Sequence, residues 1–291
     1  MLLVKATFKI IPTHDTISPV PSSKIMKYLI LSNFIFPSLA SLVNSRDKNK
    51  PLFISFLELS SRKIFNSNDD KSLILKSKTP LLTSVSFKFY EKFHEEIKEG
   101  EYKTPYGDFW VFLDKVEMID ISKITEIVER NINKNIRVTM LTPTLLSSKV
   151  LLPPSLREKY KINVGYSVLP SVGLLASYAY RTYYSLLGKS NSIENESKAF
   201  KLGVLTNALS RVVGYNLKPI TVLVGKDNKD RLRKTRGSIG WIEFDILDEK
   251  LKKAVAKYLY VSSYLGIGKS RGVGFGEIKV EFVERDKVKK N

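Results

Sequence analysis

A glycine-rich segment near the end of the chain constrains the fold more than any other feature of the sequence. It has five glycines within eleven residues, from Gly266 to Gly276. Apolar residues at helical spacing precede it up to Leu265, and an alternating strand pattern begins after it at Ile278. Glycine allows positive φ angles and close approach of the backbone to a ligand, so that N–H groups can meet phosphate oxygens. We therefore predict a final helix, a phosphate-binding loop and a strand, and no core-packing role for these glycines.

This loop does not fit a nucleotide-binding P-loop. The P-loop pattern needs a glycine at the position that Ser263 occupies. A P-loop also joins a strand to a following helix whose N-terminus faces the phosphate, whereas this loop follows a helix and precedes a strand. An NTPase is therefore excluded. The loop residues predicted to contact a phosphate backbone are Gly266, Gly268, Lys269, Ser270, Arg271 and Gly272.

The order of elements in the first half is β-α-β-β-α-β, which is typical of a ferredoxin-like domain. The expected elements are a strand over 2–11, a helix over 22–43, strands over 52–59 and 81–90, a short helix over 91–100 and a strand over 106–120. The second half repeats this order with an enlarged first crossover. Its elements are a strand over 136–146, helical segments over 171–188 and 193–214, strands over 220–224 and 238–247, a helix over 251–265 and a strand over 278–282. We predict an α+β fold of two tandem ferredoxin-like domains, 1–130 and 131–291, the second with a basic hairpin and the C-terminal glycine-rich loop.

The chain is strongly basic, with a formal net charge of +19. Such an excess favours a polyanionic partner, either a nucleic acid or an anionic membrane surface, although a solvated lysine-rich surface of a thermophilic protein would look similar. The apolar stretch 25–43 is interrupted by Lys27, Asn33 and Pro37, so we interpret it as a buried helix and not as a membrane span. We therefore favour nucleic acid.

Two groups of cations could contact it. The first lies between two expected strands and contains Lys226, Lys229, Arg231, Arg233, Lys234 and Arg236. The second surrounds the first helix and contains Lys24, Lys27, Arg46, Lys48 and Lys50, of which Lys24 and Lys27 share a helix face. Charge runs are usually solvated surface. The neighbouring glycine-rich loop favours a nucleic-acid contact for the first group, and for the second both interpretations stay open.

Other chemistry is sparse. The absence of cysteine excludes disulfides, thiolate zinc sites and a cysteine nucleophile, and together with a strand-like N-terminus in place of a signal peptide it favours a reducing cytoplasm. His94 and Glu95 do not continue into a zinc-binding motif, and His14 lies in an expected loop. We predict no metal and no cofactor.

Tandem ferredoxin-like halves that end in helix, glycine-rich loop and strand resemble the repeat-associated mysterious protein (RAMP) superfamily of CRISPR systems. The resemblance is best to its endoribonucleases that process precursor CRISPR RNA. The segments that carry it are the glycines of 266–276 with Phe275, the strand Gly237-Ser238-Ile239-Gly240-Trp241, the start of the second domain over 137–144, and the turn over 50–55. One departure matters. Many family members have a general-base histidine near the end of the first helix, where this chain has Val43-Asn44-Ser45-Arg46.

The resemblance implies metal-independent cleavage of CRISPR repeat RNA. A ribose 2′-hydroxyl attacks its own phosphate, leaving a 2′,3′-cyclic phosphate and a 5′-hydroxyl. Because nucleophile and phosphate are already tethered, positioning and cationic stabilisation can supply most of the catalysis without imidazole. The predicted catalytic residues are Lys24, Lys27, Lys50 and Arg231, and the predicted RNA-binding residues are Lys48, Lys229, Arg233, Lys234, Arg236 and those of the glycine-rich loop.

Two other functions stay open on the sequence. The missing histidine favours a catalytically inactive RNA-binding subunit of a CRISPR effector complex. An unrelated basic RNA-binding module of two ferredoxin-like domains would share the charge but not the terminal loop. A homodimer and a place in an effector complex are left open as well.

Overall fold

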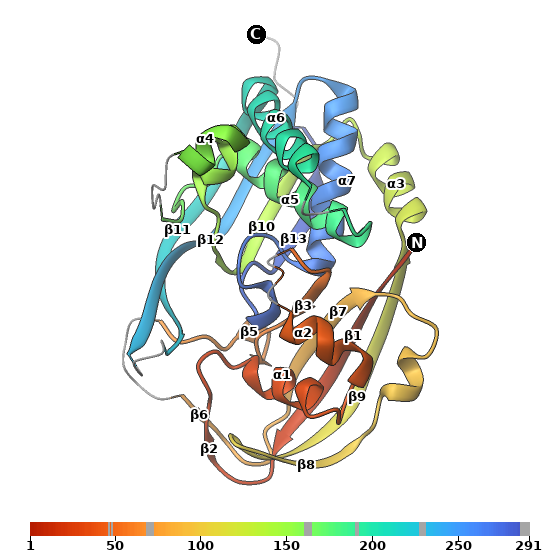
Figure 1. Cartoon of the computed structure of the whole chain (residues 1–291), viewed down its shortest axis with the longest axis vertical. Coiled ribbons are helices and arrows are strands. Elements are labelled where there is room, and N and C mark those ends of the chain that lie inside the picture. The colour runs from red at the N-terminus through yellow and green to blue at the C-terminus, as the bar shows by residue number, and fades with distance from the viewer. Residues whose placement is uncertain are drawn as a thin grey trace.

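The computed structural model describes residues 1–45, 47, 49–67, 73–159, 165–189, 192–226 and 231–285. Each half of the chain forms a β-sheet with helices against it, and the two halves lie one above the other along the long axis of the molecule (Figure 1). The predicted α+β fold of two ferredoxin-like domains is confirmed.

The N-terminal sheet is built around its first strand. Its strands are β1 (Leu2–Pro12), β3 (Leu52–Ile54), β4 (Glu58–Leu59), β5 (Arg62–Lys63), β7 (Leu81–Lys88), β8 (Gly100–Thr104) and β9 (Gly107–Asp120). β1 pairs antiparallel with β7 on one side and with β9 on the other, β3 and β4 pair with β7, and β8 pairs with β9. Val4, Ala6, Phe8 and Ile10 alternate along β1 and are fully buried, as the sequence pattern predicts.

The first helix is shorter than predicted. The expected helix over 22–43 is divided into α1 (Lys24–Leu31), the 3₁₀ turn η1 (Pro37–Leu39) and α2 (Ala40–Asn44). Between α1 and α2, both Asn33 and Phe36 adopt positive φ. The Phe36 backbone takes this conformation because its fully buried ring packs edge-on against Phe8 and Phe87 in the core. The expected helix over 91–100 is only a 3₁₀ turn, η2 (Phe93–Glu96). The apolar stretch is nevertheless buried as predicted, through Ile25, Met26, Leu29 and Ile30.

The C-terminal sheet repeats the same strand order. Its elements are α3 (Ile121–Arg130), β10 (Asn135–Thr144), η3 (Ser148–Leu151), α4 (Pro154–Lys159), α5 (Val172–Leu186), α6 (Ile193–Leu209), β11 (Ser210–Lys226), β12 (Leu232–Ile246), α7 (Glu249–Leu265), η4 (Arg271–Val273) and β13 (Ile278–Val283). The sheet order is β11-β12-β10-β13, so its first strand again lies between its third and fourth. Asp248 caps α7 by accepting a hydrogen bond from the Leu251 amide at 2.7 Å, as expected for an N-cap.

The basic hairpin is much longer than predicted. β11 and β12 pair from Ser210 opposite Ile246 to Lys226 opposite Leu232, so the predicted helix 193–214 ends at Leu209 and the cations of 233–236 lie within β12 itself. The ribbon reaches down beside the N-terminal half (Figure 1). There Val222 bridges to Ser67, and the Leu223 amide donates to the Asn66 carbonyl at 3.1 Å.

The two halves meet in a small apolar cluster and an ion pair. Phe56, Leu145, Val222 and Phe275 form the cluster, with the two phenylalanine rings edge to face at 5.1 Å. Lys63 pairs with Glu277 across the junction at 3.0 Å. α3 packs into the C-terminal core through three apolar residues, Ile121, Ile124 and Val128. This packing favours a domain boundary just before α3, and the predicted boundary at residue 130 stays a proposal.

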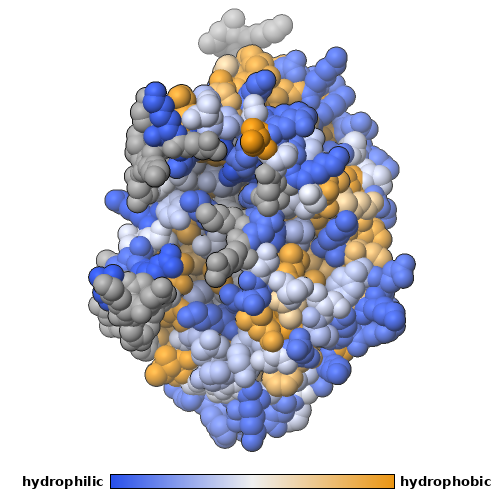
Figure 2. Space-filling view, in the orientation of Figure 1, coloured by the Kyte–Doolittle hydropathy of each residue, from blue (hydrophilic) through white to orange (hydrophobic). Residues whose placement is uncertain are grey.

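The surface seen in Figure 2 carries hydrophilic residues over most of this face, with hydrophobic residues in small groups between them. Among the described residues, none of the helices combines the length and the hydropathy needed to cross a bilayer.

Candidate functional site

The glycine-rich loop lies at the junction of the two halves and is mostly buried. A Cβ on Gly266 would lie 2.6 Å from the Phe53 ring, and one on Gly274 would lie 2.6 Å from the Phe56 ring. Gly276, at φ +77°, would bring a Cβ to 1.9 Å from a backbone carbonyl. The expectation that these glycines have no packing role is therefore wrong, because they let a C-terminal loop touch N-terminal phenylalanines.

The same burial changes the assignment of two loop residues. Gly266 and Gly268 were predicted to contact RNA, but both are buried, and Gly268 packs against the Leu145 carbonyl. We assign them to packing. The accessible tip of the loop is formed by Lys269, Ser270 and Gly272, which are half-buried.

The loop tip faces the first helix across a small cavity of about 200 Å³. Cations from three segments line it, namely Lys27 from α1, Lys50 from the turn before β3 and Arg271 from η4, together with Asp47, Ser270 and Gly272. Two of the three predicted catalytic lysines are thus brought together with the loop.

Lys50 is held in a fixed position at this cavity. Its Nζ donates to the Val43 carbonyl at 2.6 Å and to the Ser45 carbonyl at 3.2 Å, at the C-terminal end of α2. Burial, and then repulsion from Lys27, lowers the pKa of Lys50, with Asp47 opposing and Arg271 contributing. The segment in which the family's histidine was expected therefore serves to orient a lysine.

Arg271 is buried at the edge of this cavity. It is 5% exposed, and its guanidinium donates to the carbonyls of Leu265 at 3.1 Å and Lys50 at 2.9 Å. Burial lowers the pKa of Arg271 to about 10, with Asp47 opposing, so the group stays charged at neutral pH. It was predicted to bind RNA, but its donors are turned to the backbone, so it contributes its charge and the shape of the loop.

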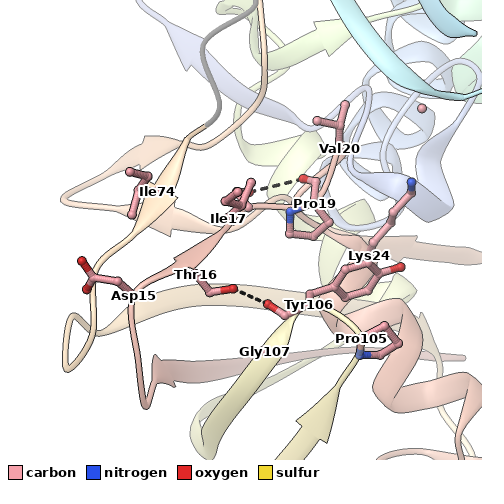
Figure 3. Close-up of a pocket in the computed structure, with 12 residues that line it drawn as sticks. Asp15, Thr16, Ile17, Pro19, Val20, Lys24, Ile74, Pro105, Tyr106 and Gly107 are labelled. Carbon is pink, nitrogen blue, oxygen red and sulfur yellow. Dashed lines mark hydrogen bonds between the residues drawn. The ribbon is translucent and has the colours of Figure 1, made fainter.

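Lys24, also in the first turn of α1, does not line this small cavity. It lines a larger cavity of about 800 Å³ whose walls are residues 15–20, the turn at 105–107 and Gly225 of the hairpin (Figure 3). A Cβ on Gly225 would lie 3.7 Å from the Lys24 Nζ. The basic hairpin therefore approaches the first helix at Lys24.

The remaining predicted cations are spread along the hairpin and the loop. Arg231, Arg233, Lys234 and Arg236 are exposed, and Arg233 pairs in register with Gly225, next to the larger cavity. Lys269 places its Nζ 5.2 Å from the centre of the Tyr166 ring. Lys48 and Lys229 lie outside the described residues.

Histidine plays no part in the geometry of either cavity. His14 and His94 are exposed and line neither of them. In the described ranges, no three histidine, cysteine or acidic side chains gather in a way that could hold a metal ion. The residue that sequence reasoning missed is Asp47, which offered no motif because it is a single carboxylate between two cations.

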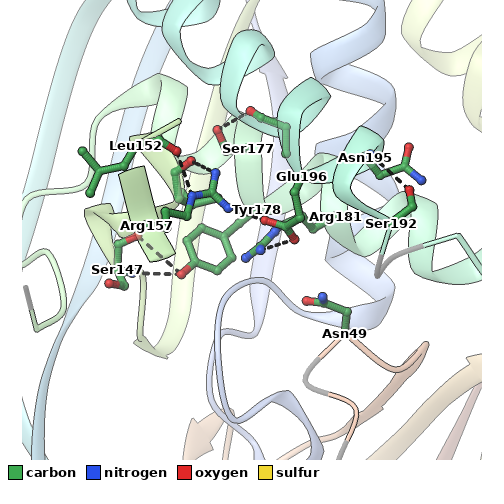
Figure 4. A network of polar contacts seen from close by, with 12 residues as sticks. Asn49, Ser147, Leu152, Arg157, Ser177, Tyr178, Arg181, Ser192, Asn195 and Glu196 are labelled. Atoms are coloured by element: carbon green, nitrogen blue, oxygen red, sulfur yellow. Dashed lines mark hydrogen bonds and ion pairs between the residues drawn. The ribbon is translucent and has the colours of Figure 1, made fainter. Parts of the chain in front are cut away.

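A second cationic cluster lies in the helical crossover of the C-terminal half. Glu196 of α6 accepts hydrogen bonds from Arg157 of α4 and Arg181 of α5 (Figure 4). Arg157 also donates to the carbonyls of Leu152 and Val150, both at 2.7 Å. These arginines are paired across three helices and hold the crossover together.

Two protein-family models match this chain. The model of the Cas6 N-terminal domain matches residues 4–119, and that of the CRISPR-associated endoribonuclease Cas6 matches residues 138–278. The chain is 52% identical over 286 residues to the CRISPR-associated endoribonuclease Cas6 1 of Saccharolobus solfataricus, covering 98% of both chains.

Solved structures share the fold at low sequence identity. A Cas6 product complex superposes with a TM-score of 0.63 at 16% identity, covering 97% of this chain and 100% of that one. Cas6 of Thermus thermophilus superposes with a TM-score of 0.58 at 14% identity, covering 96% and 98%. At these identities the likeness concerns the fold alone.

Proposed function

The chain belongs to the CRISPR-associated endoribonuclease Cas6 family, which cleaves CRISPR RNA, and from this premise we propose that its lysines cut repeat RNA at the cavity between α1 and the glycine-rich loop. The proposal extends to metal-independent attack of a 2′-hydroxyl, to precursor CRISPR RNA as the partner, and to the cytoplasm as the place of action. The family match names endoribonucleases and gives no support to an inactive binding subunit.

One observation carries this proposal. Lys27, Lys50 and Arg271 face one cavity with Asp47 as the opposing carboxylate. Burial, and then repulsion from Lys27, lowers the pKa of Lys50, so the cations at this cavity are only partly compensated. A bound phosphate would supply the missing negative charge, and a phosphorane transition state, which carries more charge, would be stabilised further.

The first turn of α1 supports the same assignment. It carries Lys24 and Lys27 and no acidic residue, although the positive end of a helix dipole favours acidic ones. Lys27 thus adds positive charge to a helix end that is already positive, on the side that faces the cavity of Lys50 and Arg271. An anion in this cavity would offset that charge, so the Lys27 side of the turn is suited to hold the scissile phosphate.

The chemical step balances without a metal. The 2′-oxygen forms a bond to phosphorus as the bond to the 5′-oxygen breaks. The 2′-hydroxyl proton leaves to solvent, since no imidazole lines either cavity, and Lys50 donates a proton to the departing 5′-oxygen. Burial favours this role, because a lysine with a lowered pKa is a stronger acid than a free one.

The remaining cations would hold the RNA on either side of the cut. Arg233, Lys234 and Arg236 are exposed along β12, and Arg231 precedes them at the hairpin end. We propose phosphate contacts for these residues and for the loop tip, with Lys48 and Lys229 kept as predictions. Arg231 is kept as a catalytic candidate only through its place on the hairpin that approaches Lys24.

Association with other chains is a further part of the proposal. Val204 and Leu205 on α6, with Val212, Val213 and Tyr215 on β11, are exposed apolar residues. Exposed apolar side chains can support association with another chain. They are suited to a homodimer or to docking in a CRISPR effector complex.

The test is incubation of the purified protein with end-labelled repeat RNA in excess EDTA. We expect one discrete cut that leaves a cyclic phosphate and that a single 2′-deoxy nucleotide abolishes. Tight binding without a cut would contradict the proposed chemistry. Cleavage that requires added divalent metal would contradict its metal independence alone.

A further inference from the structure

We propose that the cavity beside Lys24 is a binding subsite for the nucleobase next to the scissile phosphate, with Tyr106 as its stacking surface. This inference rests on the proposed function, since it assigns one part of the same RNA substrate. Its cavity of about 800 Å³ is distinct from the smaller one lined by Lys27 and Lys50.

The walls of this cavity are largely apolar and come from three separate segments. Ile17 lies in β2 (Thr16–Ile17), and Pro19 and Val20 follow it (Figure 3). Ile74 comes from β6 (Ile74–Leu75), which pairs with β2, and Tyr106 comes from the turn between β8 and β9. Ile17 and Ile74 remain 62% and 57% exposed. Large apolar side chains left exposed around a hollow are typical of a binding site for a flat, partly apolar group.

Tyr106 is held in place before any ligand arrives. The Thr16 hydroxyl donates to the Tyr106 carbonyl at 2.6 Å. Gly107 follows at φ +118°, and a Cβ there would lie 2.9 Å from the same hydroxyl oxygen, so the tight turn requires glycine. The Tyr106 ring packs edge-on against Tyr28 at 6.4 Å and is only partly buried. A preorganised, partly exposed ring on a rim is what base stacking requires.

Charge next to the cavity favours a nucleotide over a purely apolar ligand. Lys24 lines the cavity and also belongs to the helix turn proposed to hold the scissile phosphate. Among the described lining residues Asp15 is the acidic one, and its carboxylate is engaged by the Lys76 Nζ at 2.7 Å and the Ser77 amide at 2.8 Å. Within this described lining, a phosphate beside Lys24 would therefore meet a carboxylate that is already paired, and its attached base would lie beside Tyr106.

Gly225 keeps the hairpin side of the cavity open. It has φ +130° at a bulge of β11, and a Cβ there would lie 3.7 Å from both the Lys24 Nζ and the Val20 carbonyl. A side chain at this position would fill the space above Lys24. Gly225 therefore borders the cavity without occupying it.

The experiment combines RNA and protein changes in a double-mutant cycle. Repeat RNAs with an abasic site at each nucleotide flanking the scissile phosphate are compared with the intact repeat, for the wild type, Tyr106→Ala and Tyr106→Phe. The affinity is measured on RNA with a 2′-deoxy nucleotide at the cut, and the single-turnover rate on cleavable RNA. Phe112→Ala is the matched control, because Phe112 is an exposed aromatic on β9 outside this cavity.

We expect one abasic position to weaken binding of the wild type about 10-fold, as loss of one stacked base does. Tyr106→Ala should weaken intact RNA similarly and respond to that abasic site less than about 2-fold, because the partner ring is already gone. Tyr106→Phe and Phe112→Ala should behave as the wild type. Additive effects of Tyr106→Ala and the abasic site, or no abasic effect at any flanking position, would overturn the subsite while leaving the nuclease assignment intact. Absence of cleavage by the wild type would instead overturn the proposed chemistry, and the binding arm would still decide on the subsite.

Discussion

Two clusters in this molecule place an arginine close to other cations, and they differ in how the charge is balanced. In the helical crossover, the Glu196 carboxylate bonds directly to Arg157 and to Arg181. At the cavity beneath the glycine-rich loop, Arg271 bonds only to backbone carbonyls in the contacts that the structure describes. Asp47 acts on it and on Lys50 through the field alone.

This difference separates a cluster that holds the fold from one that binds a ligand. A compensated cluster loses stability when its carboxylate is removed. In an under-compensated cluster the cations repel one another in the free protein, and binding of an anion relieves that repulsion. The comparison therefore predicts opposite consequences for the two sites, in stability at one and in catalysis at the other.

The largest effect is expected for Lys50→Ala. It removes the ammonium proposed as acid and electrostatic stabiliser, so the single-turnover cleavage rate should fall about 10²–10³-fold. Thermal unfolding should shift little, because the loss of two hydrogen bonds to the Val43 and Ser45 carbonyls is offset by removal of a half-buried cation that Lys27 repels. Lys123→Ala, an exposed lysine on α3, is the matched control and should cleave normally. A rate within about 3-fold of the wild type would remove Lys50 from the proposed chemistry.

Glu196→Gln should give the reverse pattern. It leaves Arg157 and Arg181 facing each other without a carboxylate, at side-chain exposures of 12% and 20%. The free energy of unfolding should fall by about 3 kcal/mol, measured by urea denaturation, while the cleavage rate at 25 °C stays close to that of the wild type. Glu194→Gln, which breaks an exposed pair with Lys198 on the same helix, should change stability far less. A loss of cleavage with unchanged stability would break the comparison.

The hairpin offers a third kind of cation, exposed and without a proposed role in the chemical step. Arg233→Ala should weaken RNA binding a few-fold and lower the steepness of the salt dependence by about 0.7, as expected for one lost phosphate contact on single-stranded RNA. The measurement is the dissociation constant over a series of salt concentrations. An unchanged salt slope would show that Arg233 does not contact phosphate.

The sequence predicted the main strands of both halves, in their order along the chain, and the cap of α7, because strand alternation and an N-cap are local patterns. It did not predict the break between α1 and α2, since Phe36 adopts positive φ only to pack among distant core rings. The role of the glycine-rich loop was missed for the same reason. The atoms that require glycine at 266 and 274 belong to Phe53 and Phe56, about two hundred residues earlier in the chain.

The sequence predicted which kinds of residue form the candidate site better than it predicted how they are arranged in space. Lys27 and Lys50 do meet at one cavity. Lys24 faces another, because residues three apart on a helix are offset by about 60° around its axis and can point to different sides of a groove. Asp47 and the buried state of Arg271 depend on the meeting of the two halves, which no local pattern shows.

The finest test of the comparison is the pH dependence of cleavage. Lys50 must be protonated to act as the acid, so the rate should fall as the pH rises through its pKa, which burial and Lys27 hold below the ordinary lysine value. Lys27→Ala removes one repelling charge, so the pKa of Lys50 should rise and the alkaline fall of the rate should move to higher pH, even though the maximal rate decreases. Asp47→Asn removes the opposing carboxylate and should move the fall to lower pH. If both variants left the position of the fall unchanged, the group that titrates would not be Lys50, and the electrostatic account of this cavity would be wrong.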